Sequence, residues 1–204
     1  MKVAIWLVAV GALVLSAADA AAQTAQQISI QVSGIYASLF GDAYEGVDNG
    51  IGGEAQLRFT PSAFSIGAGG QYTRHGVEGL DEDLSLMGVF LEPRFVIPVG
   101  SNYFAPYVSG RLSLLRQSIS VDANSGFCVG KLSGSTTGVT ANGGGGLLVR
   151  LGSRLNLDAG ATYGYTRFGE GTIRCESTGD RLEFPSGNGS NVIVRVGLAI
   201  GLGG

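Results

Sequence analysis

The chain has a single histidine, so catalysis by an imidazole depends on what stands near it. A histidine beside a serine hydroxyl could support acyl transfer, because the imidazole accepts the hydroxyl proton. The histidine is His75, and Ser85 and Ser118 lie in segments that could neighbour it. No His-x-Ser spacing occurs here, since Gly76 and Val77 follow directly. We therefore expect no catalytic site and interpret His75 as a loop-edge residue.

Metal and cofactor sites are not expected either. With two cysteines and one histidine, the chain lacks the ligands of an ordinary zinc site. The run Asp81-Glu82-Asp83 offers oxygen ligands to a divalent ion, but such a run is more often a solvated surface. The four glycines at 143–146 lie within a strand pattern, not between a strand and a helix, so they do not predict a phosphate-binding loop.

The first residues predict export, which bears on the cysteines. Residues 1–22 have a positive start, a short apolar run and small residues suited to cleavage near Ala20 or Ala22, as in a signal peptide. The barrel domain proposed below would then span 23–204. In an exported chain Cys128 and Cys175 predict one disulfide. A free reactive pair and an intermolecular bridge are the alternatives.

The elements that must position these residues follow from side-chain alternation. Residues 191–202 read NVIVRVGLAIGL, which puts six aliphatic side chains on one face of a strand and Ile193, Arg195, Ala199 and two glycines on the other. Similar segments recur along the chain and predict eight strands, at 27–40, 53–60, 63–74, 84–97, 105–116, 139–151, 154–167 and 191–202. This pattern predicts an all-β fold, a closed antiparallel barrel.

The connections between these strands alternate between long and short. Long segments are expected at 41–52, 75–83, 117–138 and 168–190, and they hold most of the acidic residues. Short turns separated from long loops are typical of transmembrane barrels, whose long loops are extracellular and whose turns are periplasmic. Ile173 or Leu182 could extend pairing within the long segments, so a ten-strand variant stays open.

The distribution of charge predicts which face meets lipid. Charged residues make up only 14% of the chain, and mean hydropathy is +0.27. A charge on a lipid-facing strand centre costs several kcal/mol, so the mixed face should point inward. Its charged residues form an expected lumen network of Glu54, Arg58, Glu92, Arg94, Arg111, Arg150, Asp158 and Arg195. Because unpaired buried charges are costly, we expect a plugged, ion-paired interior. A selective pore with a positive lining is the alternative.

Three strands that run towards the long loops end in arginine on the apolar face. Arg74, Arg116 and Arg167 should therefore lie at the outer rim, near the phosphates of lipopolysaccharide. Simple snorkelling at the interface is the other interpretation. Tyrosines 36, 72, 163 and 165 fit an upper aromatic girdle, and phenylalanines 59, 64 and 95 a lower one.

The chain resembles the small eight-stranded outer-membrane barrels, such as the OmpA transmembrane domain, OmpX and the opacity-type proteins. The resemblance rests on the strand count, the loop alternation and three segments, Leu91-Glu92-Pro93-Arg94-Phe95, Ala105-Pro106-Tyr107-Val108 and 157–165. Such barrels usually end in an aromatic residue read by the assembly machinery, whereas this sequence ends Leu202-Gly203-Gly204.

The resemblance implies envelope structure, adhesion or small-solute passage rather than a shared reaction. Some eight-stranded barrels modify lipid A, and these need the histidine and serine discussed above. We expect an outer-membrane, non-enzymatic structural or surface-interaction protein with acidic external loops. The alternatives are a narrow porin-like channel and, third, a lipid A-modifying enzyme. The expected partners are outer-membrane lipids, lipopolysaccharide, the barrel assembly machinery and a surface ligand of the loops, with a monomeric chain and no nucleic acid.

Overall fold

The computed structural model describes residues 27–79, 82–125, 128–175 and 177–202. The predicted signal peptide at 1–22 lies outside the described residues. The wall of the molecule is formed by β1 (Ile28–Phe40), β2 (Val47–Phe59), β3 (Phe64–Val77), β4 (Leu84–Val96), β5 (Phe104–Ser125), β6 (Cys128–Arg150), β7 (Leu155–Phe168) and β10 (Asn188–Leu202). A short 3-10 turn, η1 (Asp42–Tyr44), joins β1 to β2.

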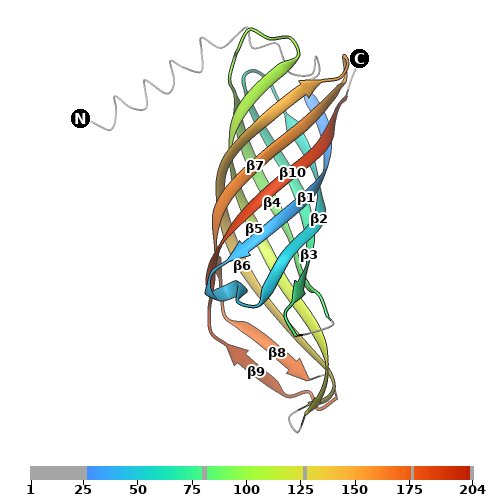
Figure 1. Cartoon of the computed structure of the whole chain (residues 1–204), viewed down its shortest axis with the longest axis vertical. Helices are drawn as coiled ribbons and strands as arrows, with labels where there is room; N and C mark the ends of the chain where they lie inside the picture. The colour runs from blue at the N-terminus through green and yellow to red at the C-terminus, as the bar shows by residue number, and fades with distance from the viewer. Residues whose placement is uncertain (1–26, 80–81, 126–127, 176, 203–204) are drawn as a thin grey trace, which may run out of the picture.

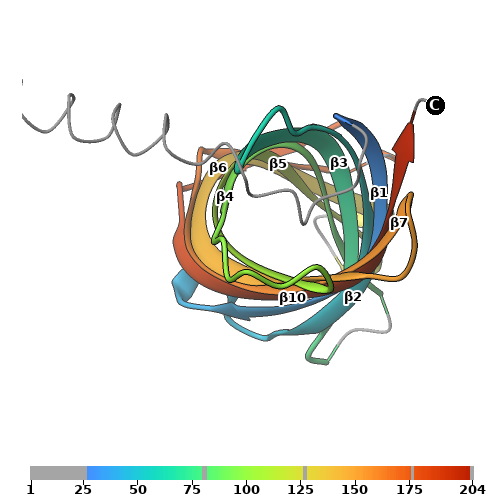
Figure 2. The same cartoon turned by 90° about the horizontal axis from the view of Figure 1, so that it is seen from above.

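These eight strands close on themselves in the described part of the chain. The order β5-β4-β3-β2-β1-β10-β7-β6 is antiparallel throughout, and pairing of β5 with β6 completes the ring (Figures 1 and 2). The first strand pairs along its whole length with the last, from Ile28 opposite Leu202 to Phe40 opposite Ser190. The predicted closed barrel is confirmed.

The two faces of the wall differ as the alternation predicts. Aliphatic side chains on the outer face remain exposed, including Val32 at 59%, Leu112 at 61% and Val196 at 54%, while charged side chains on the inner face are buried. Among the described residues, no helix is long and apolar enough to cross a membrane. An exposed apolar band this wide, with the charges sealed inside, is the arrangement of a wall that meets lipid.

The prediction of loops at 117–138 and 168–190 is wrong for much of their length. β5 continues to Ser125 and β6 starts at Cys128, so the two strands form a hairpin that extends beyond the rest of the wall. Two further strands, β8 (Gly171–Cys175) and β9 (Arg181–Phe184), pair onto β6 in the order β6-β8-β9. Together they form an external sheet (119–125, 128–135, 171–175 and 181–184), seen at the lower end of Figure 1.

This external sheet settles the open ten-strand variant. Ile173 pairs with Leu182 and with Gly134, so the two residues do extend strand pairing. β8 and β9 nevertheless attach to one edge of the hairpin and do not enter the ring, which keeps eight strands in the described residues. Apolar alternation is weak in this region because strands beyond the membrane need no continuous lipid-facing side.

Inside the ring, polar and apolar layers alternate along the axis. At the end of the barrel that carries the short turns, an apolar group packs together (Val96, Ala105, Tyr107 and Leu148). At the end that carries the external sheet, a second apolar group does so (Tyr44, Leu84, Leu86 and Phe168). Between them lie buried charged and polar side chains and a third apolar group, Ile35, Ala37 and Ile193. The lumen is therefore a packed core.

Candidate functional site

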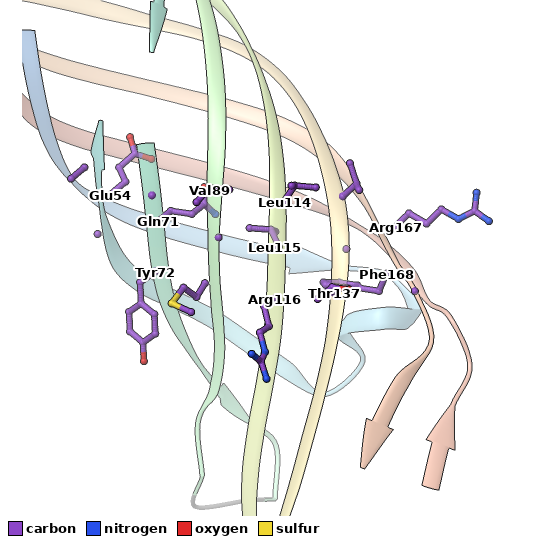
Figure 3. Close-up of a pocket in the computed structure, with 18 of the residues that line it drawn as sticks. Glu54, Gln71, Tyr72, Val89, Leu114, Leu115, Arg116, Thr137, Arg167 and Phe168 are labelled. Atoms are coloured by element: carbon purple, nitrogen blue, oxygen red, sulfur yellow. The ribbon is translucent and has the colours of Figure 1, made fainter. Parts of the chain in front are cut away.

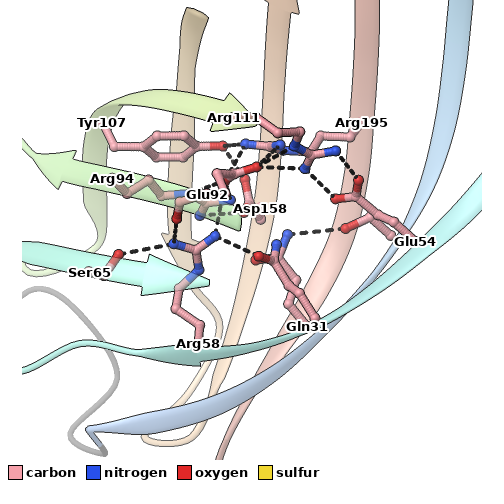
Figure 4. Close-up of polar contacts among 12 residues, drawn as sticks. Gln31, Glu54, Arg58, Ser65, Glu92, Arg94, Tyr107, Arg111, Asp158 and Arg195 are labelled. Carbon is pink, nitrogen blue, oxygen red and sulfur yellow. Dashed lines mark hydrogen bonds and ion pairs between the residues drawn. The ribbon is translucent and has the colours of Figure 1, made fainter. Parts of the chain in front are cut away.

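The centre of the interior is the carboxylate of Glu92, which is completely buried on β4. Its Oε1 atom accepts hydrogen bonds from Arg58 at 3.0 Å and from Arg94 at 2.8 Å. Its Oε2 atom accepts from Arg111 and Arg195, each at 2.5 Å. Figure 4 shows the four guanidinium groups converging on this carboxylate from different strands. One carboxylate thus joins four parts of the wall.

Two further carboxylates offset part of the remaining positive charge. Glu54 on β2 accepts from Arg111 at 2.6 Å, and Asp158 on β7 pairs with Arg94 at 2.7 Å. Asp158 also accepts a hydrogen bond from the Tyr107 hydroxyl at 2.6 Å. Four arginines and three carboxylates give the group a net charge of +1 (4 − 3). Charged hydrogen bonds of this kind are about twice as strong as neutral ones, which offsets the cost of burying the ions.

Aromatic rings support two of the arginines. The guanidinium carbon of Arg111 lies 3.9 Å from the centre of the Phe90 ring, and that of Arg94 lies 4.1 Å from the Tyr107 ring. At these distances a guanidinium is attracted to the ring face. The arrangement fixes the position of each arginine on one side by charge and on the other by an aromatic surface.

The structure therefore brings together seven of the eight residues expected in the lumen. Arg150 occupies an inward-facing position at the end of β6 and is half-buried. It takes no part in the ion pairs that join the other seven residues. Neutral partners that sequence reasoning left out also take part: Gln56 and Ser65 accept from Arg58, and Gln71 accepts from Arg111. Each lies at an inward-facing position of the strand alternation, and this pattern could have identified them from the sequence.

The inner-face glycines serve two purposes. A Cβ at Gly160 or Gly146 would strike the Tyr107 hydroxyl, and at Gly160 it would also approach Arg195. A Cβ at Gly144, Gly164 or Gly197 would instead strike a backbone carbonyl oxygen or a polar side chain of an adjacent strand. Glycine at these three positions therefore allows close approach of adjacent strands.

A second polar layer lies nearer the external sheet and contains His75. The two ring nitrogens of His75 contact the Asp48 carbonyl oxygen at 3.0 Å and the Thr73 hydroxyl at 2.9 Å. Ser85 donates to the carbonyl oxygen of Ser118 at 3.2 Å. The structure thus engages His75 and both serines in separate backbone and side-chain contacts, and His75 is buried rather than at an exposed loop edge.

Beneath this layer lies an enclosed hollow of about 20 Å³, lined by Gln71, Thr73, Asn142, Asn191 and neighbouring apolar residues. A cavity of about 10–15 Å³ holds one water, so this one accommodates one or two. Within the described residues no cluster of His, Cys, Asp and Glu has the arrangement of a metal site.

The three rim arginines lie on the outer face, where their side chains are exposed. Arg74 donates to the Tyr72 hydroxyl at 2.8 Å, and its guanidinium lies 5.7 Å from that ring. Arg116 and Arg167 sit on β5 and β7, at the level where these strands approach the external sheet. Tyr36, Tyr163 and Tyr165 are exposed on the same outer face.

The predicted disulfide between Cys128 and Cys175 is confirmed, with Cα atoms 5.7 Å apart. It joins the start of β6 to the end of β8, so it ties together the two segments of the external sheet. Both sulfur-bearing residues are buried. A bridge that closes a loop of this length stabilises a fold by about 2–4 kcal/mol.

Comparison with known proteins identifies a family and solved structures that share this arrangement. A family model described as "outer membrane protein beta-barrel domain" matches residues 5–199. The crystal structure of Neisserial surface protein A superposes with a TM-score of 0.59 at 17% identity, over 86% of this chain and 97% of that one. A major outer membrane protein from Thermus thermophilus gives 0.57 at 12% identity, over 85% and 98%. No curated protein matched the sequence.

At such identities the two structures share the fold and nothing finer. The family match spans nearly the whole chain, and it agrees with a closed antiparallel wall that is apolar outside and ion-paired inside. The chain belongs to the family of outer membrane protein β-barrel domains.

Proposed function

We propose that this protein is a non-enzymatic component of the outer membrane, with a closed barrel that anchors an external sheet for surface contacts. The observation that carries the proposal is the sealed interior. Glu92 has no exposed surface, and Arg94, Arg111 and Arg195 are 1–2% exposed. A water-filled passage would leave such groups hydrated.

The chemistry of the interior also supports a structural role. A general base needs a free lone pair and access to a substrate proton. Both oxygens of Glu92 are occupied by guanidinium groups, and the His75 ring nitrogens are occupied by Thr73 and Asp48. These groups hold the wall together, and neither Glu92 nor His75 is open to a substrate.

The external sheet supplies the proposed contact surface. Ser120, Ser133, Arg174 and Arg181 form one row across its four strands, and three of them are exposed on the sheet's polar side. The disulfide ties β8 to the start of β6 and so fixes the segments of this surface relative to one another. A rigid platform loses little conformational entropy on binding, which favours recognition.

Conductance in planar bilayers tests the sealed interior. We expect no steady openings from the purified, folded protein at any applied voltage that the bilayer tolerates. Reproducible unitary openings would overturn the proposal and favour the narrow-channel alternative. Protease treatment of whole cells tests the second part: cleavage within 119–135 or 171–184 is expected, and complete protection of both segments would contradict surface exposure.

A further inference from the structure

One side chain from the connection between β1 and β2 enters the barrel at the end that carries the external sheet. Tyr44 in η1 is buried, although Asp42 and Glu45 on either side of it are exposed. Its ring meets the Phe168 ring edge-on, with the ring centroids 5.7 Å apart. Phe168 stands at the end of β7, next to Thr137 of β6 (Figure 3). Tyr44 is therefore a plug that points inward from an exposed segment.

Glycines at the start of β10 leave room for this segment. A Cβ added at Gly189 would lie 2.5 Å from the Tyr44 ring, which is too close for any real side chain. A Cβ added at Gly187, just before β10, would lie 3.1 Å from the Cβ of Ala43. The absence of side chains at these two positions gives the plug its seat against the inner face of the wall.

The plug segment joins the barrel at two glycines with left-handed backbone. The φ angle is +97° at Gly41 and +72° at Gly46, which residues with a side chain rarely adopt. Gly46 accepts a hydrogen bond from the Glu78 amide at 2.8 Å. Among the described residues, positions 42–45 make no backbone hydrogen bond outside the segment. Between its two glycines the segment is thus held mainly by side-chain packing.

Beneath the plug lies the enclosed hollow of about 20 Å³, which Tyr44 lines together with Thr73. The Thr73 hydroxyl contacts Nε2 of His75 at 2.9 Å. Leu84, which stands opposite His75 in the ladder between β3 and β4, packs in the same apolar group as Tyr44. His75 is the only histidine in the sequence and is buried directly behind the plug. Its reactivity therefore reports whether the plug is in place.

We propose that residues 41–46 form a hinged lid, which swings out at Gly41 and Gly46 and admits water to the polar layer around His75. Hinge motion concentrates in a few residues, and glycines absorb such backbone rotations without steric cost. Below this layer the cluster around Glu92 still seals the lumen, so the open lid uncovers a vestibule and not a pore. The lid rests on the sealed interior of the proposed function, but not on what the external sheet contacts.

The rate at which diethyl pyrocarbonate modifies His75 measures the opening of the lid. Untagged, folded protein in detergent is treated with the reagent, and mass spectrometry follows the peptide that contains His75. Tyr44→Ala removes the plug, whereas Tyr44→Phe keeps its ring. Tyr36→Ala is the matched control, because Tyr36 is exposed on the outer face of β1. Electrophoretic mobility without boiling confirms that each variant is folded.

A further variant locks the lid in its closed position. Ala43→Cys/Gly187→Cys places two Cβ atoms close to the separation that a disulfide bridges. Ala43→Ser/Gly187→Ser is its matched control, because it introduces side chains of similar size that cannot form a bridge. Mass spectrometry of the disulfide-linked peptides confirms that the new bridge forms beside the native one.

We expect slow modification of His75 in the wild type, in Tyr44→Phe and in both controls. The rate should be at least tenfold higher in Tyr44→Ala and at least tenfold lower in the locked variant. Equal rates in the wild type and Tyr44→Ala, or a rate in Tyr44→Phe as high as in Tyr44→Ala, would overturn the role of the ring as the plug.

The hinge has its own contrary outcomes. Equal rates in the locked variant and its serine control, or no measurable modification of the wild type, would show that the lid does not open. Conductance of the wild type tests the sealed interior separately. Unitary openings there would contradict the proposed function, whereas the His75 rates alone decide whether the lid exists.

Discussion

Glu92 and Arg195 are 103 residues apart in the sequence, yet their side chains meet at 2.5 Å inside the barrel. Their strands, β4 and β10, lie four positions apart in a ring of eight described strands, and so face one another across its full diameter. Both side chains are buried to 2% exposure or less. The pair is therefore a cross-brace, which holds opposite walls of the cylinder at a fixed separation.

This cross-brace predicts a large effect of neutralising Glu92. Glu92→Gln keeps the shape of the side chain but leaves four guanidinium groups around a neutral amide, and breaking a buried pair by removing one partner costs about 3–5 kcal/mol. We expect the unfolding midpoint in denaturant to fall accordingly, measured by loss of the unboiled mobility. Glu54→Gln is the control, because Glu54 forms an ion pair with Arg111 alone among the described residues. An equal effect of the two substitutions would contradict the central role of Glu92.

The wall of the barrel was predictable because membrane crossing constrains every second residue. Ile28, Ile30 and Val32 must meet lipid while Ser29, Gln31 and Ser33 fill the lumen, so the alternation is visible in the sequence alone. Beyond the membrane this constraint ends. The stretch from Lys131 to Thr137 is rich in serine, threonine and glycine, and it is held in strand form by pairing with β5 and β8. Such pairing leaves little trace in composition.

The alternation of side chains along each strand also predicted that the charged residues lie in the interior. It could not predict which of them form ion pairs with one another. Contact between Arg58 and Glu92, or Arg111 and Glu54, depends on the stagger of strands around the ring. Stagger is fixed by the whole set of strand registers, not by any local segment.

Removing the disulfide should loosen the external sheet without loosening the barrel. In Cys128→Ser/Cys175→Ser, β8 keeps only its short pairing with β6 and β9 only its pairing with β8, and the lost constraint amounts to about 2–4 kcal/mol. We expect trypsin to cleave after Lys131, Arg174 or Arg181 at least tenfold faster. The unfolding midpoint of the barrel serves as the internal control and should not move. Unchanged cleavage would show that strand pairing alone holds the sheet.

His75 should prove to be a structural residue. Substitution of His75 by Ala leaves the Thr73 hydroxyl and the Asp48 carbonyl without partners, and an unsatisfied buried polar group costs about 1–3 kcal/mol. We expect lower stability and an identical lipid A mass spectrum in cells that express either protein. Thr73→Val is the matched control, since it removes the same hydrogen bond from the other side. A lipid A mass change that depends on His75 but not on Thr73 would instead favour the enzyme alternative.

Two leucines of equal exposure allow a direct test of the lipid-facing wall. Leu91 on β4 and Leu182 on β9 are each 51% exposed, but Leu91 lies in the middle of a wall strand and Leu182 on the external sheet. If the wall meets acyl chains, Leu91→Arg costs about 2–4 kcal/mol, whereas Leu182→Arg places its charge in water and costs little. Denaturant titration of the protein refolded into lipid vesicles measures both. Equal tolerance of arginine at the two positions would mean that the apolar face does not contact hydrocarbon, because water would solvate both charges alike.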